Sequence, residues 1–467
     1  MKKNAIALIL ISIIALATGS AAGQDEKAAK VDELFAQWNK PESPGAAVGV
    51  LKDGEVVFIK GYGCANLEYG VPISPATVFD LASVSKQFCA LAIMMLADEN
   101  KLSLDDDIHK YIPEVPDFGR TITIRHLLHH TSGLRDWPAT LGIGGWRMDD
   151  VIAFEQILKM VRHQQSLNFD PGDEYTYSNT GYNLLAETVA RVSGKSFRAY
   201  CDEKIFKPLG MDRTHFHDNH AEVVHNRAYS YHNDPNDGYF KAVENLTALG
   251  SSSLYSTVED LMKWLANYEK GTAGGPGVLE RMSEQGVLNN GERISYARGL
   301  VVEDYRGMKS ISHGGSWGGF RTDLVMFPEQ RLGVVVLCNL SNMRAGLLSR
   351  KVAEIFLAME PDTEGPDRER PETASYDIDP AALNEYAGTY YSPELDTSYA
   401  IAVEEGRLKA AHIRHRDQWL TPTGKDEFKG EEWWFDKITF VRDSDGWINS
   451  LTVTNMPRVR NVKFIRK

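Results

Sequence analysis

The chain has 467 residues, of which 43% are hydrophobic and 25% are charged, so it can form a sizeable core and two or three domains. Its formal net charge of −13 at pH 7 argues against a nucleic-acid-binding protein, because such proteins need excess basic surface to neutralise phosphates.

Residues 1–22 are predicted to form a secretory signal peptide. Lys2 and Lys3 precede an apolar run over 5–16 that is too short to span a bilayer comfortably, and small residues over 20–22 suit cleavage. No cysteine directly follows the run, so a lipid anchor is not expected. We expect an exported protein, periplasmic or secreted, with no membrane span after removal of the signal; an uncleaved anchor is the alternative.

The first folded elements predicted are a hairpin over 44–63, turning at Asp53 and Gly54, and a buried helix that follows the sequence Ser83-Val84-Ser85-Lys86. Ser83 and Lys86 form the chain's one S-x-x-K pattern, and helical spacing of three places them on the same face. A serine hydroxyl needs a base to become a nucleophile, and burial lowers a lysine pKa enough to make it one. A solvated helix face is the alternative interpretation of the pattern.

Residues 100–240 are expected to be mainly helical with long loops. Two groups of histidines fall in this region. The first group is expected to shape a loop and comprises His126, His129 and His130. The second could in principle bind a metal, but its loop-like surroundings lead us to expect no metal site; it comprises His215, His217, His220 and His225.

The sequence Tyr177-Ser178-Asn179 lies between a Pro-Gly turn at 171–172 and a predicted helix, so Tyr177 should project from a loop into a cleft. A nearby lysine ammonium would favour the phenolate form of Tyr177. Asn179 offers both a donor and an acceptor to a ligand. A turn stabilised by Asn and Ser side chains is the simpler alternative.

A helix is predicted over 254–268 and strands over 296–340. The strands contain His313-Gly314-Gly315-Ser316, whose glycines allow close approach by a ligand or by another part of the backbone. Free backbone N–H groups beside small residues can hold an oxyanion. A glycine-rich turn with a structural histidine is the alternative.

The final part of the chain changes character. Residues 360–375 are charged and proline-rich and are predicted to be a linker, whereas 376–467 contain short strands with tight turns and are predicted to be a small all-β domain. The cysteines fit no zinc motif, and one disulfide could form without the sequence assigning it; they are Cys64, Cys89, Cys201 and Cys338.

Taken in order, the three motifs resemble those of the penicillin-recognising serine hydrolases, which include class C beta-lactamases, D-aminopeptidases and related esterases. Those proteins carry S-x-x-K, then Y-x-N, then K-T-G or H-x-G, and the resemblance covers residues 31–359. It implies an α+β fold with an antiparallel sheet flanked by helices and a mostly helical subdomain. The small all-β domain resembles the lipocalin-like barrel appended to some relatives.

The same resemblance implies residue roles. Ser83 would be the acyl-enzyme nucleophile, Lys86 and Tyr177 would share the acid and base work, and Asn179 would contact the substrate amide. The oxyanion would be held by the backbone N–H groups of Ser83 and Ser316, on the strand that also carries His313 and Gly315. No cofactor and no metal are implied.

We therefore expect an exported serine hydrolase acting on small molecules or short peptides: amides, including those with a D-residue, or esters. His313 stands where many beta-lactamases carry a lysine, and a mostly neutral histidine attracts a substrate carboxylate poorly. A beta-lactamase and a non-catalytic peptidoglycan-sensing receptor are the alternatives. The physiological substrate, the role of the barrel and the oligomeric state are left open by the sequence.

Overall fold

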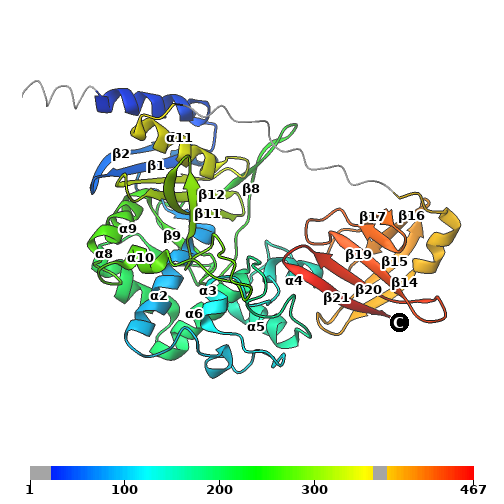
Figure 1. Ribbon diagram of the computed structural model, residues 1–467. Coiled ribbons are helices and arrows are strands. Elements are labelled where there is room, and N and C mark those ends of the chain that lie inside the picture. Colours follow the sequence, from blue (N-terminus) through cyan, green and yellow to red (C-terminus); the bar gives the residue numbers. More distant parts are fainter. Residues whose placement is uncertain (1–22, 361–375) are drawn as a thin grey trace, which may run out of the picture.

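The computed structural model describes residues 23–360 and 376–467, which form an α+β part and a β-barrel (Figure 1). The expected fold class is confirmed: an antiparallel sheet flanked by helices is followed by an all-β barrel. The predicted signal peptide, and nearly all of the predicted linker, lie outside the described residues.

The central sheet has six strands in the order β10-β11-β12-β13-β1-β2, so strands from both ends of the α+β part meet in its middle. All neighbours are antiparallel. The strands are β1 (Ala46–Lys52), β2 (Glu55–Tyr62), β10 (Val301–Tyr305), β11 (Met308–Trp317), β12 (Phe320–Phe327) and β13 (Leu332–Cys338). The predicted hairpin at Asp53 and Gly54 joins β1 to β2.

Both faces of the sheet are covered, which explains why β13 is a continuous apolar run. Because side chains alternate along a strand, Val334 and Val336 pack in one core while Val335 and Leu337 pack in the other. The first core lies under the helix over residues 23–35 and under α11 (Ala345–Leu357); α9 (Val258–Lys270) covers the second.

The helical region lies beneath the second face and is built around α2 (Lys86–Asp98), which is buried on almost every side, and α6 (Asn179–Ser193). The other helices here are α3 (Ile124–Leu128), α4 (Trp137–Ile143), α5 (Phe154–His163), α7 (Phe197–Cys201), α8 (Lys207–Leu209) and α10 (Val278–Met282). Short strands border them: β3 (Cys64–Asn66), β4 (Val71–Pro72), β5 (Phe79–Asp80), β6 (His215–Phe216), β7 (Tyr231–Asp234), β8 (Gly238–Lys241) and β9 (Leu254–Ser256).

The helix predicted over 254–268 is wrong at its start. Residues Leu254–Ser256 form β9, which pairs with both β5 and β6, and the helix begins only at Val258. The boundary is set by Thr257, which adopts an extended backbone and accepts a hydrogen bond from the Asp260 N–H at 3.1 Å as the N-cap.

The barrel is closed, and its strands follow each other in chain order. They are β14 (Gly388–Ser392), β15 (Thr397–Glu404), β16 (Arg407–Ala411), β17 (Gln418–Gly424), β18 (Glu427–Lys429), β19 (Lys437–Arg442), β20 (Ile448–Asn455) and β21 (Val459–Arg466). A 3₁₀ segment over Pro380–Tyr386 precedes them, and its Leu383 and Tyr386 belong to the barrel core.

The barrel docks on α4, beside the helical region (Figure 1). Ala139 and Ile143 of α4 belong to the barrel core, and the Tyr399 hydroxyl donates to the Ile143 carbonyl at 3.0 Å. A buried ion pair between Arg135 and Glu394 also crosses the interface. The barrel therefore contacts the α+β part through apolar packing, a hydrogen bond and an ion pair.

In the described part of the chain, no helix is both long and apolar enough to cross a membrane. The four cysteines are all buried free thiols, so the disulfide that the sequence allowed is not formed.

Candidate active site

A cavity of about 1120 Å³ opens between β11, the mouth of α6 and the barrel. Six of the seven predicted site residues line it: Ser83, Tyr177, Asn179, His313, Gly315 and Ser316. The seventh, Lys86, is fully buried and contacts Ser83 from below. The fold thus brings all three sequence motifs to one place.

Ser83 lies on a 3₁₀ turn over Ala82–Ser85, and α2 begins only at Lys86. Side chains three apart eclipse each other in a 3₁₀ turn, which brings Lys86 Nζ to 3.2 Å from Ser83 Oγ. Ala82 has a φ of +48°, a costly conformation for a residue with a Cβ, and the Asp80 carboxylate holds it by accepting from its N–H at 2.8 Å. The serine is therefore presented by a strained, anchored turn.

The Lys86 amine is surrounded by neutral acceptors. It lies 2.8 Å from both Asn179 Oδ1 and the Ser251 carbonyl oxygen. Burial holds the Lys86 pKa well below its usual value, and the Arg458 charge lowers it further, while the Asp136 charge opposes them. Lys86 Nζ donates to these two carbonyl oxygens and, at 3.2 Å, to the Ser83 hydroxyl oxygen. In the neutral form of the amine, one of these three positions holds a lone pair that can take the Ser83 hydroxyl proton.

Tyr177 precedes the N-cap of α6, and its ring centroid lies 4.7 Å from Lys86 Nζ. The expectation of an easily ionised phenol is wrong, because burial raises the Tyr177 pKa and outweighs the lowering by the Ser83 hydrogen bond and the Arg458 charge. Burial also lowers the pKa of Lys86, which weakens the ammonium that was expected to favour the phenolate. Tyr177 is thus a protonated phenol, suited to donating a proton.

His313 lies on β11 and is buried. Its Nδ1 lies 2.7 Å from the Gly314 carbonyl oxygen, which can only accept, so Nδ1 carries the proton and Nε2 accepts from the Tyr296 hydroxyl at 2.9 Å. Burial and the nearby Lys86 lower the His313 pKa to about 3. The third motif therefore contributes no positive charge at neutral pH.

Gly315 is required by close packing. A Cβ atom at this position would overlap the Leu81 carbonyl oxygen and Thr322 Oγ1. Because Leu81 lies just before the Ser83 turn, the absence of a side chain lets β11 run directly against that turn. The backbone of Ser316, next along the strand, is brought to the cavity beside Ser83 in this way.

Sequence reasoning missed an ion pair at the cavity wall. Asp136, at the N-cap of α4, is 1% exposed and accepts from the Asn179 N–H at 2.7 Å and from Asn179 Nδ2 at 3.2 Å. Arg458, in the turn between β20 and β21, forms an ion pair with the Asp136 carboxylate at 3.1 Å. The Arg458 guanidinium also lies 5.1 Å from the Tyr177 ring centroid.

The barrel thus supplies part of the cavity wall, through Arg458 and Trp433. No signal in the sequence could have revealed this, because Asp136 and Arg458 are 322 positions apart, one at the start of α4 and the other in a turn of the barrel. Asp136 could have been noticed as an acidic residue before Trp137-Pro138, a helix-start pattern.

The chain is similar to several known proteins. The family model described as Beta-lactamase matches residues 31–355. A D-aminopeptidase of Gluconobacter oxydans (strain 621H) is 27% identical over 370 residues, which are 79% of this chain and 67% of the relative. Penicillin-binding protein 4* of Bacillus subtilis (strain 168) is 27% identical over 409 residues, which are 82% of this chain and 87% of the relative.

Among solved structures, the octameric penicillin-binding protein homologue from Pyrococcus abyssi matches with a TM-score of 0.66 and 26% identity. The match covers 94% of this chain and 100% of that chain, so it includes both the α+β part and the barrel.

Proposed function

The chain belongs to the beta-lactamase family, and from this premise we propose that it is an exported serine hydrolase that works through an acyl-enzyme at Ser83. The observation that carries the proposal is the buried Lys86 amine, 3.2 Å from the Ser83 hydroxyl, with its other contacts made to carbonyl oxygens. A group with a lowered pKa beside a serine is the arrangement that activates a nucleophile.

In the proposed reaction, neutral Lys86 takes the Ser83 hydroxyl proton as the oxygen attacks the substrate carbonyl carbon. The backbone N–H groups of Ser83 and Ser316 stabilise the oxyanion. Tyr177, protonated in the resting state, gives its proton to the leaving amine or alcohol and regains one from Lys86. Water then cleaves the acyl-enzyme, releasing the acid and restoring the Ser83 hydroxyl.

We propose short peptides, amides with a D-residue, or esters as substrates. Neutral His313 supports this, because it supplies no cation where a lysine would attract a carboxylate. The D-aminopeptidase relative supports the D-amino-acid class.

A carboxylate-bearing beta-lactam is the second candidate. Arg321, which pairs with Ser316 across β11 and β12, and Arg344, at the start of α11, both line the cavity and could replace the missing lysine charge.

The decisive experiment combines labelling and turnover. Intact-protein mass after fluorophosphonate treatment should show one adduct, mapped to Ser83 and absent in Ser83→Ala. A steady-state panel of a nitrophenyl ester, a D-alanyl anilide and a chromogenic cephalosporin then separates the substrate classes. An unlabelled Ser83, or activity retained in folded Ser83→Ala, would refute the mechanism, and an acylation burst without turnover would favour the receptor alternative.

Export rests on the sequence of residues 1–22. Expression of the full-length chain in a Gram-negative host, followed by fractionation and N-terminal sequencing, should find a processed protein in the periplasm or medium that starts near residue 23. An unprocessed cytoplasmic product would contradict it.

A further inference from the structure

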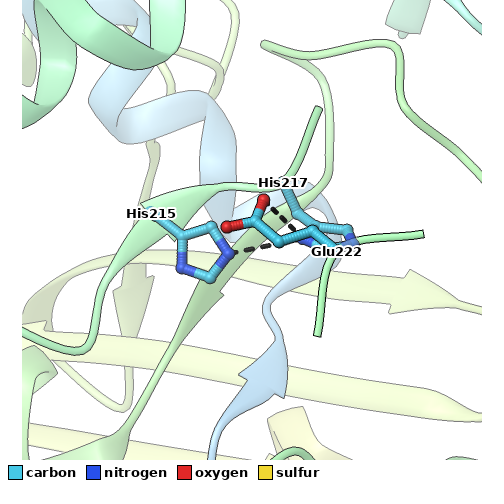
Figure 2. A group of neighbouring side chains, drawn as sticks. All are labelled: His215, His217 and Glu222. Carbon is cyan, nitrogen blue, oxygen red and sulfur yellow. Dashed lines mark hydrogen bonds and ion pairs between the residues drawn. The ribbon is translucent and has the colours of Figure 1, made fainter. Parts of the chain in front are cut away.

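A second cluster of chemistry-bearing side chains lies away from the cavity, at β6 (Figure 2). His215 Nε2 lies 3.3 Å from His217 Nδ1, and His217 Nδ1 lies 4.0 Å from Glu222 Oε2. The three ligand atoms all lie within 4.8 Å of one another. Tetrahedral zinc with ligand bonds of about 2.0–2.1 Å requires ligand atoms about 3.4 Å apart, so small side-chain rotations would suffice.

The local fold brings the two histidines together. Residues 215 and 217 flank Phe216, whose ring packs in the core against Phe197 and Phe206. Strand alternation then places both imidazoles on the opposite side. The His217 ring is held flat against Tyr255, with centroids 4.4 Å apart and the planes 11° from parallel. The loop after β6 returns Glu222 to the pair.

The protonation states suit a cation. Burial lowers the pKa of His217 to about 4 and also lowers that of His215, so both rings present lone pairs near neutral pH. The Arg198 guanidinium lowers the Glu222 pKa to about 2, so that carboxylate is ionised. Because His215 Nε2 and His217 Nδ1 share a hydrogen bond, one of them carries a proton in the metal-free cluster, and metal binding would move that proton to the other nitrogen of the same ring.

The charged groups that face the cluster are mixed in sign. Arg198 pairs with both Glu222 and Asp218, and Arg227 lies over Tyr255. A carboxylate has about four lone-pair sites, and Arg198 uses two of those on Glu222, so it can orient this ligand without occupying it fully. The two arginine charges oppose a cation, and Asp218 offsets part of that repulsion.

We propose that His215, His217 and Glu222 bind a late first-row divalent cation, with Zn²⁺ as the probe, and that water completes the coordination. Two imidazoles and a carboxylate are a donor set that suits zinc, and the ion would tie the loop over 218–227 to β6. That loop includes Arg227, whose backbone forms an isolated parallel β-bridge with Val78, shortly before the Ser83 turn. The site is thus a structural clamp, independent of the proposed hydrolysis.

The test uses the full-length protein after chelator treatment and dialysis. Competition with a chromogenic chelator should show one Zn²⁺ bound per chain at micromolar concentration, and saturating Zn²⁺ should raise the Tm by about 3 °C or more. Co²⁺ should give the intense visible absorption of tetrahedral coordination.

His217→Ala and the milder His215→Gln should each weaken Zn²⁺ binding by at least about tenfold and abolish the Tm shift. Since His215 is only half-buried, its variant remains informative even if His217→Ala does not fold. His220→Ala, an exposed histidine of the same loop, is the matched control and should bind as the parent does. Absence of stoichiometric binding, binding that survives both cluster variants, or equal loss in the control would overturn the proposal.

Discussion

The ion pair between Asp136 and Arg458 offers a test of the role of Lys86, because removing each charge should shift the Lys86 pKa in an opposite direction. Asp136 raises the pKa of Lys86 and Arg458 lowers it. A lysine with a lowered pKa is protonated as the pH falls through that value, so hydrolysis should show an acid limb where Lys86 takes up a proton. Asp136→Asn should move this limb to lower pH, and Arg458→Ala should move it to higher pH.

The magnitude follows from Coulomb's law. Asp136 reaches Lys86 through two hydrogen bonds of Asn179, 3.2 and 2.8 Å long. A unit charge about 7 Å away at an effective dielectric constant of about 20 contributes about 2.4 kcal/mol, and solvent near the cavity mouth reduces this to about 1–2 kcal/mol. The neutral fraction of Lys86 on the acid limb should therefore rise roughly tenfold in Asp136→Asn. Arg458 is 41% exposed, so its removal should have a smaller effect of the opposite sign.

The assay is kcat/KM against pH with a neutral nitrophenyl ester, whose own charge does not change. Arg460→Ala is the matched control, because Arg460 also pairs across the interface, with Glu174, but does not line the cavity. Its acid limb should stay in place. Limbs that move in the same direction in Asp136→Asn and Arg458→Ala, or that move equally in Arg460→Ala, would refute the electrostatic account of Lys86.

Three further predictions concern single contacts. Tyr177→Phe should lower kcat for an anilide by about 100-fold or more, because it deletes the proton donor, whereas Tyr175→Phe, two residues earlier, should leave kcat within about twofold; equal losses would contradict the assignment. Gly315→Ala should abolish turnover or unfold the α+β part, since its Cβ would overlap the Leu81 carbonyl oxygen. A fully active and equally stable variant would show that β11 need not touch the Ser83 turn. Arg135→Met should lower the free energy of unfolding, measured by calorimetry, by about 3 kcal/mol, because Glu394 is left buried without its partner. The double variant Arg135→Met with Glu394→Leu should recover most of that loss. No recovery would mean that the ion pair is not the cause.

The sequence predicted best those features that neighbouring residues specify. The hairpin at Asp53 and Gly54 was predictable because the turn type depends on two residues. The continuous apolar run of β13 marked a strand covered on both faces, and the alternation in barrel strands such as β15 marked strands covered on one face. The start of α9 was misplaced because residues 254–256 are drawn into a sheet by β5 and β6, partners that are distant in sequence.

In the candidate site, too, some features could be predicted from neighbouring residues and others depend on the fold. The residue types at 83, 86, 177 and 313 are those on which the proposed chemistry depends, and the spacing of Ser83 and Lys86 within one turn can be read directly from the chain. The protonation states cannot, because they depend on burial and on charges brought from elsewhere. Tyr177 illustrates this: a lysine neighbour predicts an acidic phenol, yet desolvation reverses the direction of the shift.

By itself, the sequence determined the order and spacing of the three motifs and, through the family resemblance that these motifs carry, the expected fold class. Only the tertiary structure decided that Arg458 of the barrel reaches Asp136 and that His215, His217 and Glu222 meet beside β6. The physical reason is that electrostatic and coordination contacts act over a few ångströms in space, whatever the separation along the chain, and only the packed fold fixes those distances.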